Sequence, residues 1–74
     1  MATTTTISSK IGEDAGEVYR YLRDHANGEV KATQIKSELD LSTSDVYLAL
    51  GWLAREGNVE PRKNGNSVRV ELTR

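Results

Sequence analysis

The sequence contains no cysteine and no phenylalanine, and only one proline, one histidine and one tryptophan. Without cysteine it can form neither a disulfide framework nor a cysteine-ligated metal site. Acidic and basic residues nearly cancel, leaving a formal net charge of −1, so the positive charge typical of a strong nucleic-acid-binding domain is missing. No apolar run is long enough to span a bilayer, and the N-terminus lacks the basic and apolar segments of a secretory signal. We therefore expect a cytoplasmic protein without a membrane partner.

The chain of 74 residues is long enough for a single small domain. A domain of this size buries only about 60% of the surface that its unfolded chain exposes, so its stability margin is narrow. Since the composition supplies no cross-link, stability must come from close packing or from a partner subunit.

Residues 1–8 are rich in threonine and predict a disordered lead-in, followed by one domain over residues 9–74. Ser9 is placed to cap a first helix from Ile11 to His25. Acidic residues fill the early turns of this helix and basic residues fill its late turns, as the helix dipole favours. Its apolar stripe recurs at helical spacing and consists of Ile11, Ala15, Val18, Leu22 and Ala26.

Two short elements and a third helix follow. Glu29–Lys31 predicts a strand, Thr33–Leu39 predicts a two-turn helix, and Asp40-Leu41 predicts a tight connection. Ser42 then caps the third helix, in which Asp45 completes a pattern similar to a capping box. Gly57 ends that helix at the position where glycine is favoured.

The C-terminal segment predicts a β-hairpin. Val59–Lys63 and Asn66–Thr73 form its strands, and Asn64-Gly65 predicts a type I′ turn between them. Pro61 lacks an amide donor, which places its strand at a sheet edge or confines it to non-pairing positions. One face of the second strand is expected to be buried, through Val68, Val70 and Leu72.

This order of elements predicts an α+β fold of the winged helix-turn-helix type, with three helices, a short strand and a C-terminal β-hairpin wing. Its apolar positions suffice for one compact core. The predicted core residues are Ile11, Ala15, Val18, Leu22, Val30, Ile35, Leu39, Leu41, Val46, Leu50, Leu53, Val59, Val68, Val70 and Leu72.

Residues 12–22 (GEDAGEVYRYL) and 46–56 (VYLALGWLARE) resemble a family of short prokaryotic winged-helix proteins that is catalogued as a domain of unknown function. The likeness covers nearly the whole chain after Ile7, and the string from Ala49 to Glu56 is its most specific part. The resemblance implies a winged-helix fold and carries over no catalytic or binding residues. The wider superfamily mostly binds DNA, which is an analogy at the level of the fold.

The third helix presents apolar residues on both of its sides. Val46, Leu50 and Leu53 form the side expected to face the core, whereas the opposite side lacks the polar residues of an ordinary surface helix. Large aromatic side chains dominate many protein interfaces, and a glycine lets a second backbone approach closely. We therefore predict a protein interface made of Tyr47, Leu48, Gly51, Trp52 and Arg55. The alternative is that the wing or the N-terminal segment folds over Trp52 within the monomer.

Contacts to nucleic acid are expected mainly from the wing. In helix-turn-helix proteins, outward residues early in the second helix of the motif read bases, and flanking basic groups hold phosphates. The early outward positions of the third helix carry none of the Arg, Lys, Asn or Gln side chains that read bases in a bidentate way, and its one cation, Arg55, lies late in the helix. These early positions are Thr43, Ser44, Tyr47, Leu48 and Gly51. The candidate nucleic-acid contacts are Arg62, Lys63, Asn64, Asn66 and Arg69 of the wing, with Thr43 and Ser44 of the helix.

Nothing in the sequence predicts catalysis. The hydroxyl groups of Ser42, Thr43 and Ser44 are best read as the start of a helix, because a serine nucleophile needs a neighbouring base that a third group orients. The single histidine, His25, lies at the end of another helix, where a cation is favoured. We expect no enzyme activity, cofactor, metal site or small-molecule ligand.

The sequence thus predicts a non-catalytic winged-helix module that forms a homodimer and has a regulatory role linked to nucleic acid, with double-stranded DNA as a candidate partner. In this interpretation the wing contacts phosphates, and the outer face of the third helix serves association. The alternative is a protein-protein interaction domain that does not bind DNA. A steep salt dependence of binding to duplex DNA would separate the two.

Overall fold

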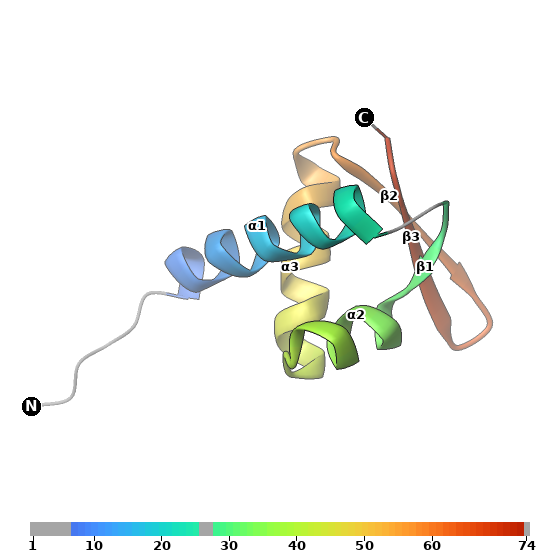
Figure 1. Cartoon of the computed structure of the whole chain (residues 1–74), viewed down its shortest axis with the longest axis horizontal. Coiled ribbons are helices and arrows are strands. Elements are labelled where there is room, and N and C mark those ends of the chain that lie inside the picture. The colour runs from blue at the N-terminus through green and yellow to red at the C-terminus, as the bar shows by residue number, and fades with distance from the viewer. Residues whose placement is uncertain (1–6, 26–27, 74) are drawn as a thin grey trace, which may run out of the picture.

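The computed structural model describes residues 7–25 and 28–73. In chain order the elements are α1 (Ile7–His25), β1 (Val30–Lys31), α2 (Ala32–Leu39), α3 (Thr43–Arg55), β2 (Val59–Asn64) and β3 (Ser67–Leu72). The strands form a three-stranded antiparallel sheet in the order β1-β3-β2. In Figure 1 the three helices pack together and the sheet stands at one side of them. The predicted α+β winged-helix architecture is confirmed.

The core lies where the three helices meet the inner face of the sheet. Leu22, Ile35, Val18, Val46 and Val70 are its largest fully buried side chains, and they come from α1, α2, α3 and β3. Most of the predicted core is buried. The exceptions, which are only partly buried, are Ile11, Leu39, Leu41, Val68 and Leu72.

Three small or polar side chains in the interior did not follow from the apolar pattern. Ala32, Ala49 and Asp14 are all less than a tenth exposed. The two alanines belong to the core cluster, and a pattern based on large apolar residues does not detect them. Ala26, which the sequence places on the apolar stripe of α1, lies outside the described residues.

The first helix starts earlier than the sequence predicts. It begins at Ile7, so the predicted cap at Ser9 is wrong and residues 7 and 8 belong to the helix rather than to the lead-in. Ile7 and Ile11 are four residues apart, which continues the helical apolar spacing backward. As a consequence no acidic residue lies in the first turn, so the expected match of acidic side chains to the start of the helix dipole is also wrong. Residues 1–6 lie outside the described part of the chain.

Both ends of α3 are built as the sequence predicts. At its start, the Ser42 Oγ accepts a hydrogen bond from the backbone N–H of Asp45 at 3.1 Å. At its end, Gly57 has a φ of +78°. The Asn58 N–H donates to the Leu53 carbonyl at 2.9 Å and the Gly57 N–H donates to the Ala54 carbonyl at 3.1 Å, which is the Schellman pattern.

The wing turn lies one residue further along the chain than predicted. Asn64 pairs with Ser67, so the two central residues are Gly65 and Asn66. Gly65 has a φ of +65°, whereas Asn66 does not have a positive φ. The predicted type I′ turn, which needs a positive φ at both central positions, is therefore wrong. A glycine with positive φ at the first central position is the pattern of a type II′ turn.

An ion pair ties the first helix to the start of the third. The Lys10 Nζ lies 2.9 Å from a carboxylate oxygen of Asp14 and 3.2 Å from one of Asp45. Lys10, followed by Ser42, lowers the pKa of Asp45 below its usual value, and the two carboxylates raise the pKa of Lys10. None of the helices in the described ranges combines the length and apolar character needed to cross a bilayer.

Gly65→Val is expected to destabilise the protein by about 1 kcal/mol or more, because a β-branched residue is strained at positive φ. The cost is conformational, since a Cβ at Gly65 would meet no atom within 4 Å. Gly65→Asn is the matched control, and it should lose less stability because asparagine tolerates this conformation. Equal melting temperatures for the valine variant and the parent would contradict the turn assignment.

Leu50→Ala should destabilise the monomer by about 2–5 kcal/mol, because it leaves a cavity in the core. Leu48→Ala should leave the stability of the monomer nearly unchanged, because Leu48 is 46% exposed whereas Leu50 is 3% exposed. Urea denaturation at low protein concentration measures both changes. A large loss for the Leu48 variant under those conditions would mean that this side chain contributes to the core.

Acid should weaken the link between α1 and α3. The pKa of Asp45 is lowered in the folded state, so the ion pair stabilises the protein above the unfolded pKa of about 4. This contribution is lost as the pH falls through the folded pKa. Lys10→Gln should therefore be less stable than the parent at pH 7, and the difference should shrink between about pH 4 and pH 2. Lys36→Gln, which removes an exposed lysine of α2, is the control, and a constant difference across this range would refute the role of Asp45.

Candidate protein and nucleic-acid interfaces

The outer face of α3 is apolar, as its sequence predicts. Val46, Ala49, Leu50 and Leu53 are buried on the inner side of this helix. The exposed large hydrophobic side chains in the described part of the chain are Tyr47 at 43%, Leu48 at 46% and Trp52 at 42%. All three belong to α3, and the helical spacing groups them on its outward side.

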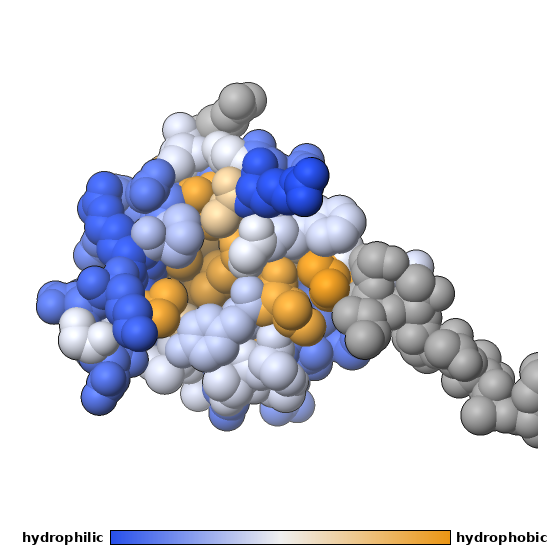
Figure 2. All heavy atoms as spheres, turned by 180° about the vertical axis from the view of Figure 1, so that it is seen from behind, coloured by the Kyte–Doolittle hydropathy of each residue, from blue (hydrophilic) through white to orange (hydrophobic). Residues whose placement is uncertain are grey.

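The outward side of α3 forms a stripe with a gap at its centre. Ser44, Leu48, Gly51 and Arg55 follow one another at helical spacing and are all exposed. A Cβ added at Gly51 would meet no atom within 4 Å, so a second backbone could approach there. In Figure 2, which views the molecule from the side where α3 lies nearer than α1, apolar surface gathers in the middle and hydrophilic side chains border it.

The start of α3, where a DNA reader presents base-contacting groups, is occupied by hydroxyls. Thr43 and Ser44 are exposed, and the Ser44 Oγ lies 3.3 Å from the Ser42 Oγ. Arg55 is the only cation of this helix, and it lies in the last turn. The start of the helix therefore offers no side chain suited to bidentate reading of a base edge.

The sheet separates the predicted wing residues into different surfaces. Arg62 pairs with Arg69 across β2 and β3, and Arg69 pairs with Lys31 across β3 and β1. Residues directly opposite one another share a face, so these three cations form one row, called here the basic row. Val70 is buried, and the alternation along β3 places the basic row on the outer face of the sheet.

The remaining predicted wing residues lie elsewhere. Lys63 pairs with Val68 and so belongs to the other face of the hairpin. Asn64 and Asn66 are exposed at the tip. Lys31 was not among the sequence candidates, although the short strand that contains it was predicted. Its position beside Arg69 follows from a long-range strand pairing, which no local pattern encodes.

The cations of the basic row differ in their partners. The Arg62 Nη1 lies 3.2 Å from a carboxylate oxygen of Glu29 and 3.6 Å from one of Glu71. Arg69 is partly buried, and its Nε has no hydrogen-bond partner among the described residues. Lys31 is exposed and forms no ion pair with any residue of the described ranges. Among the described residues, Arg62 is therefore the one cation of the row that is paired with a carboxylate.

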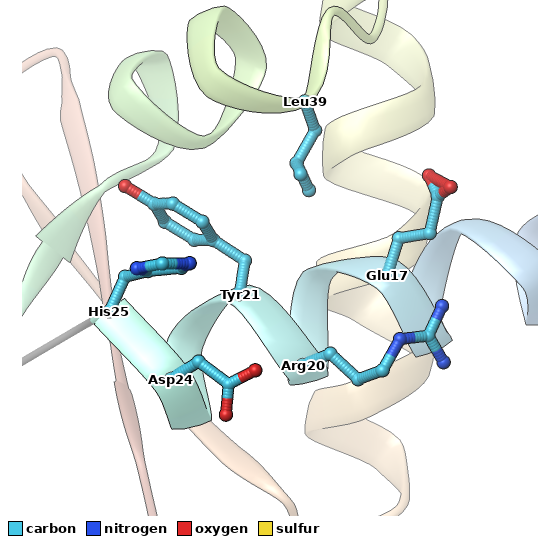
Figure 3. A pocket seen from close by; sticks show the side chains of 6 residues that line it. All are labelled: Glu17, Arg20, Tyr21, Asp24, His25 and Leu39. Carbon is cyan, nitrogen blue, oxygen red and sulfur yellow. The ribbon is translucent and has the colours of Figure 1, made fainter.

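A separate hollow of about 280 Å³ opens beside α1 and α2. Figure 3 shows the rings of Tyr21 and His25 side by side, with Leu39 reaching toward them from α2. The ring centroids are 5.3 Å apart, and the Tyr21 hydroxyl accepts a hydrogen bond from the Gln34 amide at 3.0 Å. Glu17, Arg20 and Asp24 complete the lining. In residues 7–25 and 28–73, no three His, Asp or Glu side chains are grouped so as to hold a metal ion.

The fold recurs in solved structures. The solution NMR structure of protein BT2368 from Bacteroides thetaiotaomicron matches with a TM-score of 0.77 at 24% identity, covering 90% of this chain and 79% of that one. HlyU from Vibrio cholerae matches with a TM-score of 0.63 at 25% identity, covering 96% of this chain and 83% of that chain. Reduced HlyU from Vibrio cholerae matches with a TM-score of 0.62 at 26% identity, covering 92% of this chain and 77% of that chain.

No curated protein gives a significant match to the sequence. The model of one family, described as a winged helix-turn-helix domain (DUF2582), matches residues 4–72. That match spans all three helices and the whole sheet, and it agrees with the resemblance of residues 12–22 and 46–56. The chain therefore belongs to the DUF2582 family of winged helix-turn-helix domains.

Proposed function

We propose that this chain is a non-catalytic, cytoplasmic winged-helix module that forms a homodimer through the outer face of α3 and acts in regulation at double-stranded nucleic acid through its sheet and wing. One observation carries the assignment of α3 to association. Tyr47, Leu48 and Trp52 are each more than two fifths exposed on the helix face where a base-reading protein presents polar and basic groups.

A second copy of the chain is the partner that fits this face, because the stripe complements itself. When two copies of α3 cross in opposite directions about a two-fold axis that passes through the outer face midway between Leu48 and Trp52, Leu48 of each copy meets Trp52 of the other. The same symmetry brings Arg55 of one copy toward Asp45 of the other, whose side chain is 28% exposed and already lies 3.2 Å from the Lys10 Nζ. The apolar groups between the two ends, rather than this charge pair, make the antiparallel arrangement favourable.

Burial of the exposed parts of Leu48 and Trp52 is the main favourable contribution to such an interface. Burying a large apolar side chain contributes about 1.5–3 kcal/mol, so Leu48 and Trp52 of two copies contribute several kcal/mol before the cost of association is subtracted. Gly51 lets the two backbones approach closely at the centre, since no atom lies within 4 Å of the position of a Cβ there. The narrow stability margin of a single small domain makes this additional burial useful.

A protein-interaction domain that never contacts DNA is the second candidate, and one observation favours it. Arg62, a principal cation of the wing, already has two carboxylate partners, at 3.2 Å and 3.6 Å. Binding to a non-specific duplex at several salt concentrations separates the two functions. Phosphate contacts give an affinity that falls steeply as salt rises, whereas a protein adaptor gives no measurable binding.

Trp52→Ala is expected to convert the dimer into a monomer whose core is intact, because Trp52 is 42% exposed in the monomer and contributes little to its packing. Sedimentation equilibrium measures the oligomeric state, and circular dichroism checks the fold. In the parent, fluorescence should shift to the red on dilution, since Trp52 is the single tryptophan and becomes hydrated when the dimer dissociates.

Tyr21→Ala serves as the control, because it removes an aromatic ring from α1 rather than from the α3 face. This variant should stay dimeric. A parent protein that sediments as a monomer at high micromolar concentration would end the homodimer proposal. A Trp52 variant that stays dimeric would show that the copies meet through a different surface.

A further inference from the structure

The basic row is unfavourable for the stability of the free protein, and this effect needs an explanation. Arg62, Arg69 and Lys31 lie directly opposite one another on three neighbouring strands. Like charges in opposite positions of a sheet destabilise it, because their side chains are only about 5 Å apart at Cβ. Three cations in one row therefore lower the stability of the free protein unless an anion lies over them.

Charge is segregated along the outer face of the sheet. The row next to the basic row, further from the turn, pairs Glu60 with Glu71. From Arg62 through the turn to Arg69 the sequence contains no carboxylate. The half of the hairpin nearer the turn, together with Lys31, is therefore cationic, while the half further from it is acidic. This separation is hidden in the nearly neutral composition of the chain.

The carboxylates reach only one member of the basic row. Glu29 and Glu71 lie 3.2 Å and 3.6 Å from Arg62. The Nε of Arg69 is buried without a hydrogen-bond partner in the described part of the chain. Arg69 also forms no ion pair with a carboxylate of the described residues. A guanidinium carries five N–H donors, so the terminal N–H groups of this partly buried side chain, rather than the buried Nε, are the ones that an anion could contact.

From this arrangement we infer that the backbone of a nucleic-acid duplex lies across the outer face of the sheet, with its phosphates on Arg69 and Lys31. The inference rests on the proposed nucleic-acid function and deepens it, because it assigns the main contact to the sheet face rather than to α3 or the turn. Guanidinium groups bind phosphate oxygens in a bidentate way, and a lysine adds a point charge. Asn64 and Asn66 are exposed at the tip of the wing, where their side-chain amides supply further hydrogen-bond donors to the same nucleic-acid strand.

Arg62 is less available to phosphate than Arg69 and Lys31 in this arrangement. Its guanidinium is held by Glu29 and Glu71, so phosphate must compete with two carboxylates for it. Neutralising Glu29 removes the nearer competitor and makes Arg62 available. This arrangement thus predicts one effect of opposite sign, because a substitution outside the basic row, at Glu29, strengthens binding to the duplex.

The test is a titration of a short fluorescent duplex of arbitrary sequence with the full chain, followed by anisotropy at several salt concentrations between 50 and 200 mM. Lys31→Gln and Arg69→Gln should each lower the slope of log affinity against log salt by about one unit. Lys31 is exposed and its side chain makes no capping bond to α2, so its variant keeps the fold even where the Arg69 variant does not. Glu29→Gln should bind more tightly than the parent.

Two controls change the charge by the same amount away from the sheet. Arg23→Gln and Glu13→Gln alter exposed residues of α1, and both should bind with the slope of the parent. A parent that binds with a salt-dependent affinity, while Lys31→Gln and Arg69→Gln keep its slope, would overturn the inference and leave the proposed function standing. A parent that shows no salt-dependent binding, or that binds an acidic peptide in place of the duplex, would overturn both.

Discussion

The structure depends on the packing of α3, because this helix contacts every other layer of the fold. Its inner side buries Val46, Ala49, Leu50 and Leu53 against α1, α2 and the sheet. Within residues 7–25 and 28–73, no element covers the opposite side of the same helix, where Tyr47, Leu48 and Trp52 are exposed. The side chains of this outer face are therefore not held in place by the core.

The sheet applies a second constraint, which comes from alternation along its central strand. β3 sends Val70 into the core, so its neighbours Arg69 and Glu71 must lie on the outer face. Pairing on both sides of β3 then extends Arg69 into the basic row, and pairing with β2 places Glu60 opposite Glu71. The strand β1 is short, but its pairing with β3 is what places Lys31 beside Arg69.

The sequence was sufficient to predict features that depend on local signals. The caps of α3 and the inward phase of Leu50 follow from a few neighbouring residues. The start of α1 did not follow, because Ser9 is an acceptable cap in isolation and the helix nevertheless continues back to Ile7. The turn also did not follow, because pairing along the full length of β2 and β3 sets its register. Lys31 was missed for the same reason, since its neighbour is distant in sequence.

The two proposed functions lie on separate surfaces, with association on the outer face of α3 and nucleic-acid binding on the outer face of the sheet. This separation explains how a chain of net charge −1 could contact nucleic acid. Screening limits the reach of an exposed charge to about 10 Å at 0.1 M salt, so a phosphate over Arg69 responds to the neighbouring cations rather than to the whole protein. A dimer formed through α3 would present the basic row twice, once on each side of the two-fold axis. Two weak contacts joined in this way raise the affinity without any new contact, provided that both rows can reach the same duplex. Association through the apolar face and binding through the sheet would then depend on each other.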